Sequence, residues 1–191
     1  MPPRPPWVPL ILVAVVAASV LLDPLVWSLL PASSSGERDW HRLLRVMGWL
    51  PTWCAVGLGF ALHDGRWRRA IQLVGPATAA GASAEVLKLL VRRTRPDATG
   101  EVVFRAFSDR TWDTSGLGMP SSHVAVAFGA AFALARLHPR TLPLGLALAA
   151  GCALTRVIDR AHLLSDCAVA ALLAWVVVVL SARLFPRQVP T

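Results

Sequence analysis

Apolar residues fall in long blocks along this chain, and short polar segments separate the blocks. This arrangement is typical of a bilayer protein rather than of a soluble core. A helical bilayer span takes about 20 residues, with a range of about 17 to 25. Six blocks stand at residues 7–30, 46–62, 70–91, 122–137, 142–157 and 163–185.

These blocks predict an all-α, polytopic membrane protein: one domain over residues 1–191, built as a bundle of six transmembrane helices. The first, third and sixth blocks are long enough to span easily, whereas the other three are short. Short spans suit a compact bundle, or a protein with functional groups below the membrane surface. The first block continues past the length of a signal peptide and shows no clear cleavage site, so we expect a retained span.

Composition supports this interpretation and narrows the partners. The 191 residues are 55% apolar and 16% charged, whereas a soluble domain carries about 25% charge. The net charge of +8 comes from short basic clusters between apolar blocks, without the basic helix face of a nucleic-acid module, so nucleic acid is not an expected partner. The three cysteines have no paired spacing, which indicates neither a zinc site nor a disulfide framework.

Six spans would place both termini on one side, together with the links at 63–69 and 136–140. The other side would receive the segments 31–45, 92–120 and 156–162. Eight of the nineteen Lys and Arg residues lie on the terminal side and eleven on the other. If several of those eleven bind a ligand, they are not topology signals, so charge alone leaves the orientation open.

The third block ends in KLLVRRTRP, which places Lys88 inside an apolar span. Ionisable groups inside spans are costly and are functional candidates by default. If the helix continued to Arg95, Lys88 and Arg95 would lie on one face, about 10.5 Å apart in rise. Pro96 disfavours helix at the preceding residue, so we favour Arg95 at the start of a loop, turned inward.

The fourth block opens with Pro120, Ser121, Ser122 and His123. The start of a helix has free N–H groups and the positive end of the helix dipole, which favours an anion there.

Between the fifth and sixth blocks, the segment TRVIDRAHLLSD contains Arg156, His162 and Asp166. A four-residue step places His162 and Asp166 on the same helix face. The carboxylate can then hold one imidazole nitrogen and leave the other free as a base or nucleophile.

The patterns Lys-x6-Arg-Pro, Pro-Ser-x-His and Arg-x5-His-x3-Asp, in this order, resemble the motifs of the type 2 phosphatidic-acid phosphatase superfamily of lipid phosphate phosphatases. Each pattern is weak alone, and the ordered set at one membrane face is strong. The resemblance covers nearly the whole chain, because the motifs fall at the third to sixth spans. It implies a membrane-integral lipid phosphatase that needs no metal and no other cofactor.

The resemblance also implies roles for individual residues. His162 would attack phosphorus and form a phosphohistidine, with Asp166 orienting the imidazole. His123 would protonate the leaving oxygen and later activate water. The amides of Ser122 and His123 would complete the phosphate cradle. The side chains expected to bind phosphate are Lys88, Arg95, Ser121, Ser122 and Arg156.

Other residues depart from the family pattern or have simpler explanations. Ser122 stands where the family usually has glycine, and Thr155 where it usually has serine, so we expect changes in substrate fit rather than loss of activity. Lys88 has Glu85 one turn earlier as a possible ion-pair partner. Asp23 has no assigned role. A solvated or lipid-headgroup face is the expectation for Arg92, Arg93, Arg105, Arg110 and Arg160.

Three functions remain open from the sequence. The first is a phosphatase for a lipid phosphate or diphosphate, such as undecaprenyl diphosphate, phosphatidic acid or phosphatidylglycerol phosphate, in a bacterial plasma membrane with an extracytoplasmic site. The second is a lipid phosphotransferase with an alcohol acceptor, and the third a non-catalytic lipid-anion binding or transport protein. The loop 97–119, with three aromatic residues among charges, is the expected substrate-selecting lid. The physiological lipid, the preference for mono- or diphosphate and the oligomeric state remain open.

Overall fold

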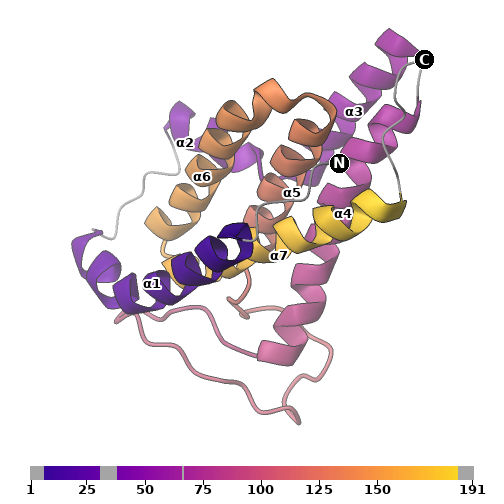
Figure 1. The fold of residues 1–191 in the computed structure, drawn as a ribbon. Helices are drawn as coiled ribbons and strands as arrows, with labels where there is room; N and C mark the ends of the chain where they lie inside the picture. The colour runs from indigo at the N-terminus through magenta and orange to yellow at the C-terminus, as the bar shows by residue number, and fades with distance from the viewer. Residues whose placement is uncertain (1–6, 31–37, 66, 185–191) are drawn as a thin grey trace.

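The computed structural model describes residues 7–30, 38–65 and 67–184, and helices make up most of these residues (Figure 1). This confirms the prediction of an all-helical protein for the described part of the chain. The α-helices are α1 (Trp7–Leu29), α2 (Asp39–Val46), α3 (Leu50–Asp64), α4 (Trp67–Val91), α5 (Ser122–Leu137), α6 (Leu142–Ile158) and α7 (Leu164–Leu184), with a 3-10 turn, η2 (Pro139–Thr141), before α6.

Four of these helical segments are long and apolar enough to cross a membrane: α1, α4, α6 with its 3-10 turn, and α7. The pair α2 and α3 qualifies as a fifth span only if the two are counted together across a bend of 69°. Helix α5 is apolar but has only 16 residues. The protein is therefore an integral membrane protein, whereas the count of six spans stays a prediction. Residue 185, the expected end of the last span, lies outside the described residues.

The bend between α2 and α3 differs from the predicted single span at 46–62. Helix α2 has the sequence DWHRLLRV, in which apolar and charged residues occupy different sides of a short helix, so it lacks the continuous apolar run of a span. Helix α3 begins afresh at Leu50, with Pro51 in its first turn, where a proline costs no hydrogen bond. Gly48, between the two helices, is buried.

Small residues allow the central helices to approach closely. Helix α5 packs against α4, α6 and α7. A Cβ atom on Gly129 of α5 would lie 3.0 Å from Cβ of Ala80 in α4, and one on Gly81 would lie 2.7 Å from Val126. Close backbone approach through small residues is the usual way in which membrane helices associate. Helix α1 lies along α7, although the two are far apart in sequence (Figure 1).

Arg92 organises the long loop that follows α4. It has a positive φ of 59°, so the helix ends at Val91 and the chain turns away from the helix axis. Only 1% of Arg92 is exposed, which contradicts the expectation of a solvated face. Its guanidinium donates hydrogen bonds to four backbone carbonyl groups of the loop, and these belong to Arg105, Ala106, Asp109 and Thr111.

Candidate active site

The three sequence motifs meet where the end of α4, the start of α5 and the junction of α6 and α7 come together. The backbone N–H of Ser121 donates to the carbonyl oxygen of Asp166 at 3.2 Å, which joins the start of α5 to the first turn of α7. The loop after α4 closes over the same point. A Cβ atom on Gly118 would lie 3.1 Å from Oδ2 of Asp166 and 3.0 Å from the carbonyl oxygen of Thr94, so glycine permits this close approach.

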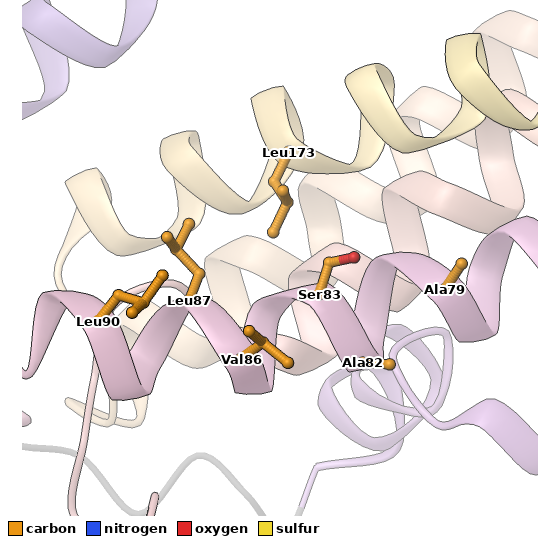
Figure 2. Close-up of a pocket in the computed structure, with 7 residues that line it drawn as sticks. All are labelled: Ala79, Ala82, Ser83, Val86, Leu87, Leu90 and Leu173. Atoms are coloured by element: carbon orange, nitrogen blue, oxygen red, sulfur yellow. The ribbon is translucent and has the colours of Figure 1, made fainter.

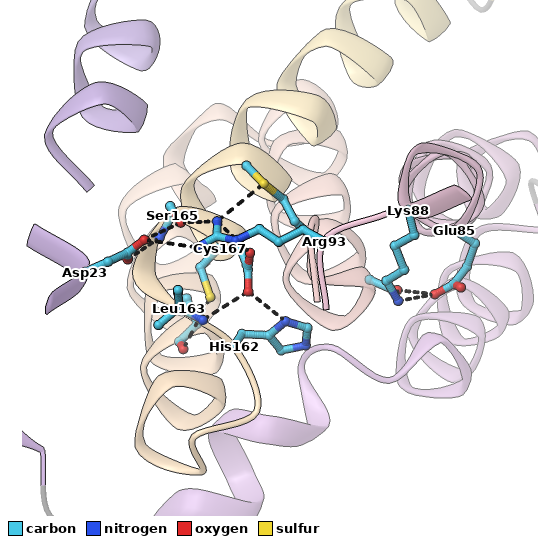
Figure 3. Close-up of polar contacts among 12 residues, drawn as sticks. Asp23, Glu85, Lys88, Arg93, His162, Leu163, Ser165 and Cys167 are labelled. Carbon is cyan, nitrogen blue, oxygen red and sulfur yellow. Dashed lines mark hydrogen bonds and ion pairs between the residues drawn. The ribbon is translucent and has the colours of Figure 1, made fainter. Parts of the chain in front are cut away.

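His162 lies at the centre of the site (Figure 3), and Asp166 contacts it. His162 Nδ1 lies 3.5 Å from Oδ2 of Asp166, which is an ion-pair distance, and within the described residues Nδ1 makes no hydrogen bond. His162 precedes α7, so the two residues do not share a helix face as predicted. They meet instead because Asp166, in the first turn of α7, also accepts a hydrogen bond from the backbone N–H of Leu163 at 3.0 Å. One carboxylate thus caps the helix and faces the imidazole.

The environment of His162 favours its neutral form. Burial lowers the pKa of the His162 imidazole from its ordinary value, because a charged ring loses hydration there. The Asp166 carboxylate opposes this shift, and the positive charges of Arg156 and Arg95 add to it. A neutral imidazole with one nitrogen held by a carboxylate has its other nitrogen available as a nucleophile or base.

His123, the second residue of α5, lies near the same group of charges. The charges of Arg156, Arg45, His162 and Lys88 all act on its imidazole. The bend between α2 and α3 packs directly against it, since a Cβ atom on Gly48 would lie 2.8 Å from Cβ of His123. The structure therefore brings the two predicted histidines into one electrostatic environment.

Arg156 is connected to α2 through Asp159, which contacts both Arg156 and His41. It lies in the last turn of α6 and is 6% exposed. Its Nη1 is 3.6 Å from Oδ2 of Asp159, and Oδ1 of Asp159 is 2.9 Å from Nε2 of the buried His41. Within the described residues, Nε of Arg156 and the hydroxyl of Ser121 are buried without a hydrogen-bond partner. Buried polar groups are nearly always satisfied, so each of these two atoms can still accept a partner.

Lys88 links α4 to the first residue of α5. Its ammonium group donates to Glu85 Oε1 and to the Ser122 hydroxyl, both at 2.7 Å, and the Ser122 hydroxyl in turn donates to Glu85. The pairing of Lys88 with Glu85 considered from the sequence therefore exists. Figure 3 shows this pair to one side of the cluster around His162. Ser122, which stands where the resembling family usually has glycine, therefore uses its hydroxyl to contact Lys88 and Glu85.

Arg95 lies beyond α4, in agreement with the loop alternative. Its backbone N–H donates to the carbonyl oxygen of Gly116 at 2.8 Å, and its side chain is exposed. The charge of Arg95 acts on both His162 and Arg156. An exposed arginine whose charge acts on these residues can form a charge-assisted hydrogen bond to a phosphate oxygen.

Three polar residues beside the site were not predicted as part of it. Arg93 was expected on a solvated face, but its side chain is only 11% exposed, and its guanidinium contacts Asp166 and Ser165. Ser165 in turn contacts Asp23 of α1. The only sequence signal for this cluster was a charged residue, Asp23, inside an otherwise apolar block.

Among the other arginines, Arg110 is exposed as expected, whereas Arg160 stacks on Trp27 and donates to a backbone carbonyl group.

An open apolar groove of about 470 Å³ runs between α4 and α7 (Figure 2). Neither Glu85 nor Lys88 lines it, because the lining residues of α4 share one face of the helix and Lys88 lies on the opposite face. The groove is lined by Ala79, Ala82, Ser83, Val86, Leu87 and Leu90 of α4 and by Leu173 of α7.

Comparisons with known proteins agree with the arrangement of the motifs. The family model of the PAP2 superfamily matches residues 69–190, a range that contains all three motifs. Among solved structures, the chain is similar to the "first transmembrane PAP2 type phosphatidylglycerolphosphate phosphatase from Bacillus subtilis", with a TM-score of 0.60 and 16% identity over 95% of this chain and 100% of that chain. This likeness supports the fold. Comparison with curated proteins finds no match.

Proposed function

Because the chain belongs to the PAP2 superfamily, we propose that it is a membrane-integral phosphatase that hydrolyses a lipid phosphate or diphosphate through a phosphohistidine, without a metal ion. The observation that carries the proposal is the buried His162 with Asp166 on one nitrogen and the charges of Arg156 and Arg95 beside it. A structural histidine would need the carboxylate but not the surrounding cations. A nucleophile that attacks a phosphate needs both.

In the proposed reaction, the phosphate binds among Arg156, Arg95 and Lys88 and accepts hydrogen bonds from the unpartnered Ser121 hydroxyl and Arg156 Nε. These cations stabilise the charge on the phosphoryl oxygens during transfer, which is the main task of catalysis in phosphoryl chemistry.

The covalent steps divide between the two histidines. His162 Nε2 attacks phosphorus while Nδ1–H stays on Asp166, and the P–O bond to the lipid breaks. Protonated His123 gives its proton to the leaving lipid oxygen. Neutral His123 then takes a proton from the water that attacks phosphorus, the P–N bond breaks, and inorganic phosphate leaves with His162 restored. General acid-base assistance of this kind contributes about 10²- to 10⁴-fold.

The groove between α4 and α7 supports a lipid substrate. Its apolar lining suits an acyl or prenyl tail. We propose substrates of the phosphatidic acid, phosphatidylglycerol phosphate or undecaprenyl diphosphate type, with the site on the extracytoplasmic face of a bacterial plasma membrane.

The test is release of inorganic phosphate by the detergent-purified protein, with EDTA present, from a panel of these three lipids. We expect release by the wild type and a loss of at least about 100-fold in His162→Ala. His63→Asn, at the end of α3, is the matched control and should keep full activity. Denatured samples from a labelled-substrate reaction should contain an acid-labile, base-stable phosphoprotein that is absent in His162→Ala.

Three outcomes would overturn parts of the proposal. Folded His162→Ala that still releases phosphate would remove His162 as the nucleophile. Absence of release from every lipid by folded wild-type protein would favour a lipid-anion binding protein. Transfer of the phosphoryl group to an added alcohol, with little free phosphate, would identify a phosphotransferase instead.

A further inference from the structure

Asp23 is a buried carboxylate in a helix that offers it no partner of its own. It is 7% exposed, and it is the only charged residue in α1. A charged side chain in a membrane span is costly and marks a functional position by default. The explanation must therefore lie in what Asp23 contacts on other helices.

Ser165, in the first turn of α7, is the direct partner of Asp23. The Ser165 backbone N–H donates to Oδ1 of Asp23 at 3.0 Å, and the Ser165 hydroxyl donates to Oδ2 at 2.5 Å. The first N–H groups of a helix have no partner within it. Asp23 thus caps α7 from a different helix, one residue away from Asp166.

Arg93 contacts both carboxylates, and Figure 3 shows its side chain reaching toward Ser165 and Asp23. Its Nη1 donates to the Ser165 hydroxyl at 2.8 Å and lies 3.4 Å from Oδ1 of Asp166, while its Nη2 lies 3.6 Å from Oδ2 of Asp23. Arg93 therefore contacts Asp166 through Oδ1, which leaves Oδ2 to His162 and the Leu163 N–H.

The charges of Asp23, Arg93 and Asp166 together set the net charge beside His162. Two carboxylates share one guanidinium, so the cluster keeps one net negative charge beside His162. If Asp23 were neutral, Arg93 and Asp166 would form a neutral pair, and the imidazole would lose most of the negative charge that stabilises its cationic form. The alternative is that Asp23 has only a structural role and holds α1 against α7.

We propose that Asp23 and Arg93 are positioning residues for His162, which fix the Asp166 carboxylate and keep a net negative charge beside the imidazole. This role rests on the proposed function of His162 as the nucleophile. It extends the site to α1, which contributes none of the three sequence motifs.

The kinetic test compares phosphate release by Asp23→Asn with that by Asp39→Asn, a matched control at the exposed start of α2. The asparagine keeps the shape and an acceptor for Ser165 but removes the charge. We expect kcat to fall about tenfold, as for other partners that orient a functional imidazole, with KM within about twofold of the wild type. An unchanged kcat would overturn the proposal.

A second measurement does not depend on phosphatase activity. Side-chain ¹⁵N NMR of the protein in detergent micelles, assigned with His162→Ala, gives the titration midpoint of His162. The other groups that face His162 are Asp166 of α7, Arg156 of α6, Arg95 of the loop and His123 of α5, and all are unchanged in Asp23→Asn. We expect a lower midpoint in this variant. An unchanged midpoint would reduce Asp23 to a tie between α1 and α7, even if no lipid were hydrolysed.

Arg93→Lys tests the same proposal if Asp23→Asn does not fold. Lysine keeps the positive charge but has no planar fork to contact Ser165, Asp23 and Asp166 together. We expect a fall in kcat of about tenfold with KM nearly constant. Wild-type kcat in folded Arg93→Lys would overturn the proposal.

Discussion

At the scale of single residues, the site depends on how Asp166 divides its two carboxylate oxygens. Oδ1 faces Arg93, whereas Oδ2 faces His162 and caps α7. The same residue thus stabilises a helix and orients a ring. Its substitution should therefore change both catalysis and the pH at which catalysis begins.

The pH dependence of kcat/KM should reveal the lowered pKa of His162. The nucleophile must be neutral, so activity should rise with pH as His162 loses its proton. Because burial lowers this pKa below the ordinary value of 6.5, we expect the acid limb of the wild type below pH 6.5. Asp166→Asn removes the charge that opposes the shift, so its limb should move to still lower pH while the plateau falls about 100-fold or more. A limb that moves to higher pH would contradict this assignment.

Single residues also show where sequence reasoning stops. The order of the three motifs predicted one location for Lys88, Arg95, His123, His162 and Asp166. In the structure, Lys88 acts on His123 and Arg95 acts on His162, while Asp166 contacts His162 without the shared helix face that the spacing predicted. The roles of Asp23 and Arg93 could not be predicted, since they depend on contacts across 142 and 73 residues. Nothing local distinguishes Arg93 from its neighbours in a run of arginines.

At the scale of elements, the break between α2 and α3 packs against the start of α5, where His123 lies. A Cβ atom at Gly48 would meet Cβ and the carbonyl oxygen of His123 at 2.8 Å and Sγ of Cys152 at 2.9 Å. Any side chain here must push the bend away from α5. This break was not predicted, because an apolar run shows where a span lies but not where it bends.

Gly48→Ala should therefore damage the site. We expect a loss of about 1–3 kcal/mol in the free energy of unfolding, as for other overpacked positions, and a fall in kcat as His123 moves. Gly59→Ala, in α3, is the matched control, because a Cβ atom there meets nothing within 4 Å. It should be neutral or stabilise by up to about 1 kcal/mol. Equal behaviour of the two variants in thermal unfolding and kinetics would refute a role for the close contact.

The groove between α4 and α7 gives a second prediction for elements. Ala82→Trp would fill the groove with an indole ring. We expect KM for a long-chain lipid phosphate to rise severalfold, and kinetics with a water-soluble short-chain analogue to stay unchanged. Leu144→Trp, at an exposed position of α6, should affect neither. A parallel loss with both substrates would show that the groove does not hold the tail.

At the scale of the whole molecule, the long loop after α4 and the turn between α5 and α6 lie at opposite ends of α5. The loop closes over the candidate site, and several of its aromatic side chains are exposed, with Trp112 at 85%. The sequence predicted the helices well, because continuous apolar runs specify them locally. The sequence left the orientation open. Several arginines on the loop side contact the candidate site or the loop itself, so their number gives no signal of membrane topology.

Cysteine labelling decides the orientation. In a Cys54→Ala background, in which Cys152 and Cys167 are buried, Trp112→Cys and Arg140→Cys report on the two sides. With an extracytoplasmic site, a membrane-impermeant maleimide should label Trp112→Cys in intact spheroplasts and Arg140→Cys only after permeabilisation. The reverse pattern would place the site in the cytoplasm.

The position of α1 beside α7 has a consequence for biogenesis. Asp23 leaves the ribosome 142 residues before Ser165, and its other partner, Arg93, also follows much later. During this interval the chain lacks the groups that contact the carboxylate in the folded protein. An unpaired aspartate costs up to about 2.5–3.5 kcal/mol at the centre of a span, and Asp23 lies in the last third of α1. The contacts of Asp23 therefore become complete only once α7 has been synthesised.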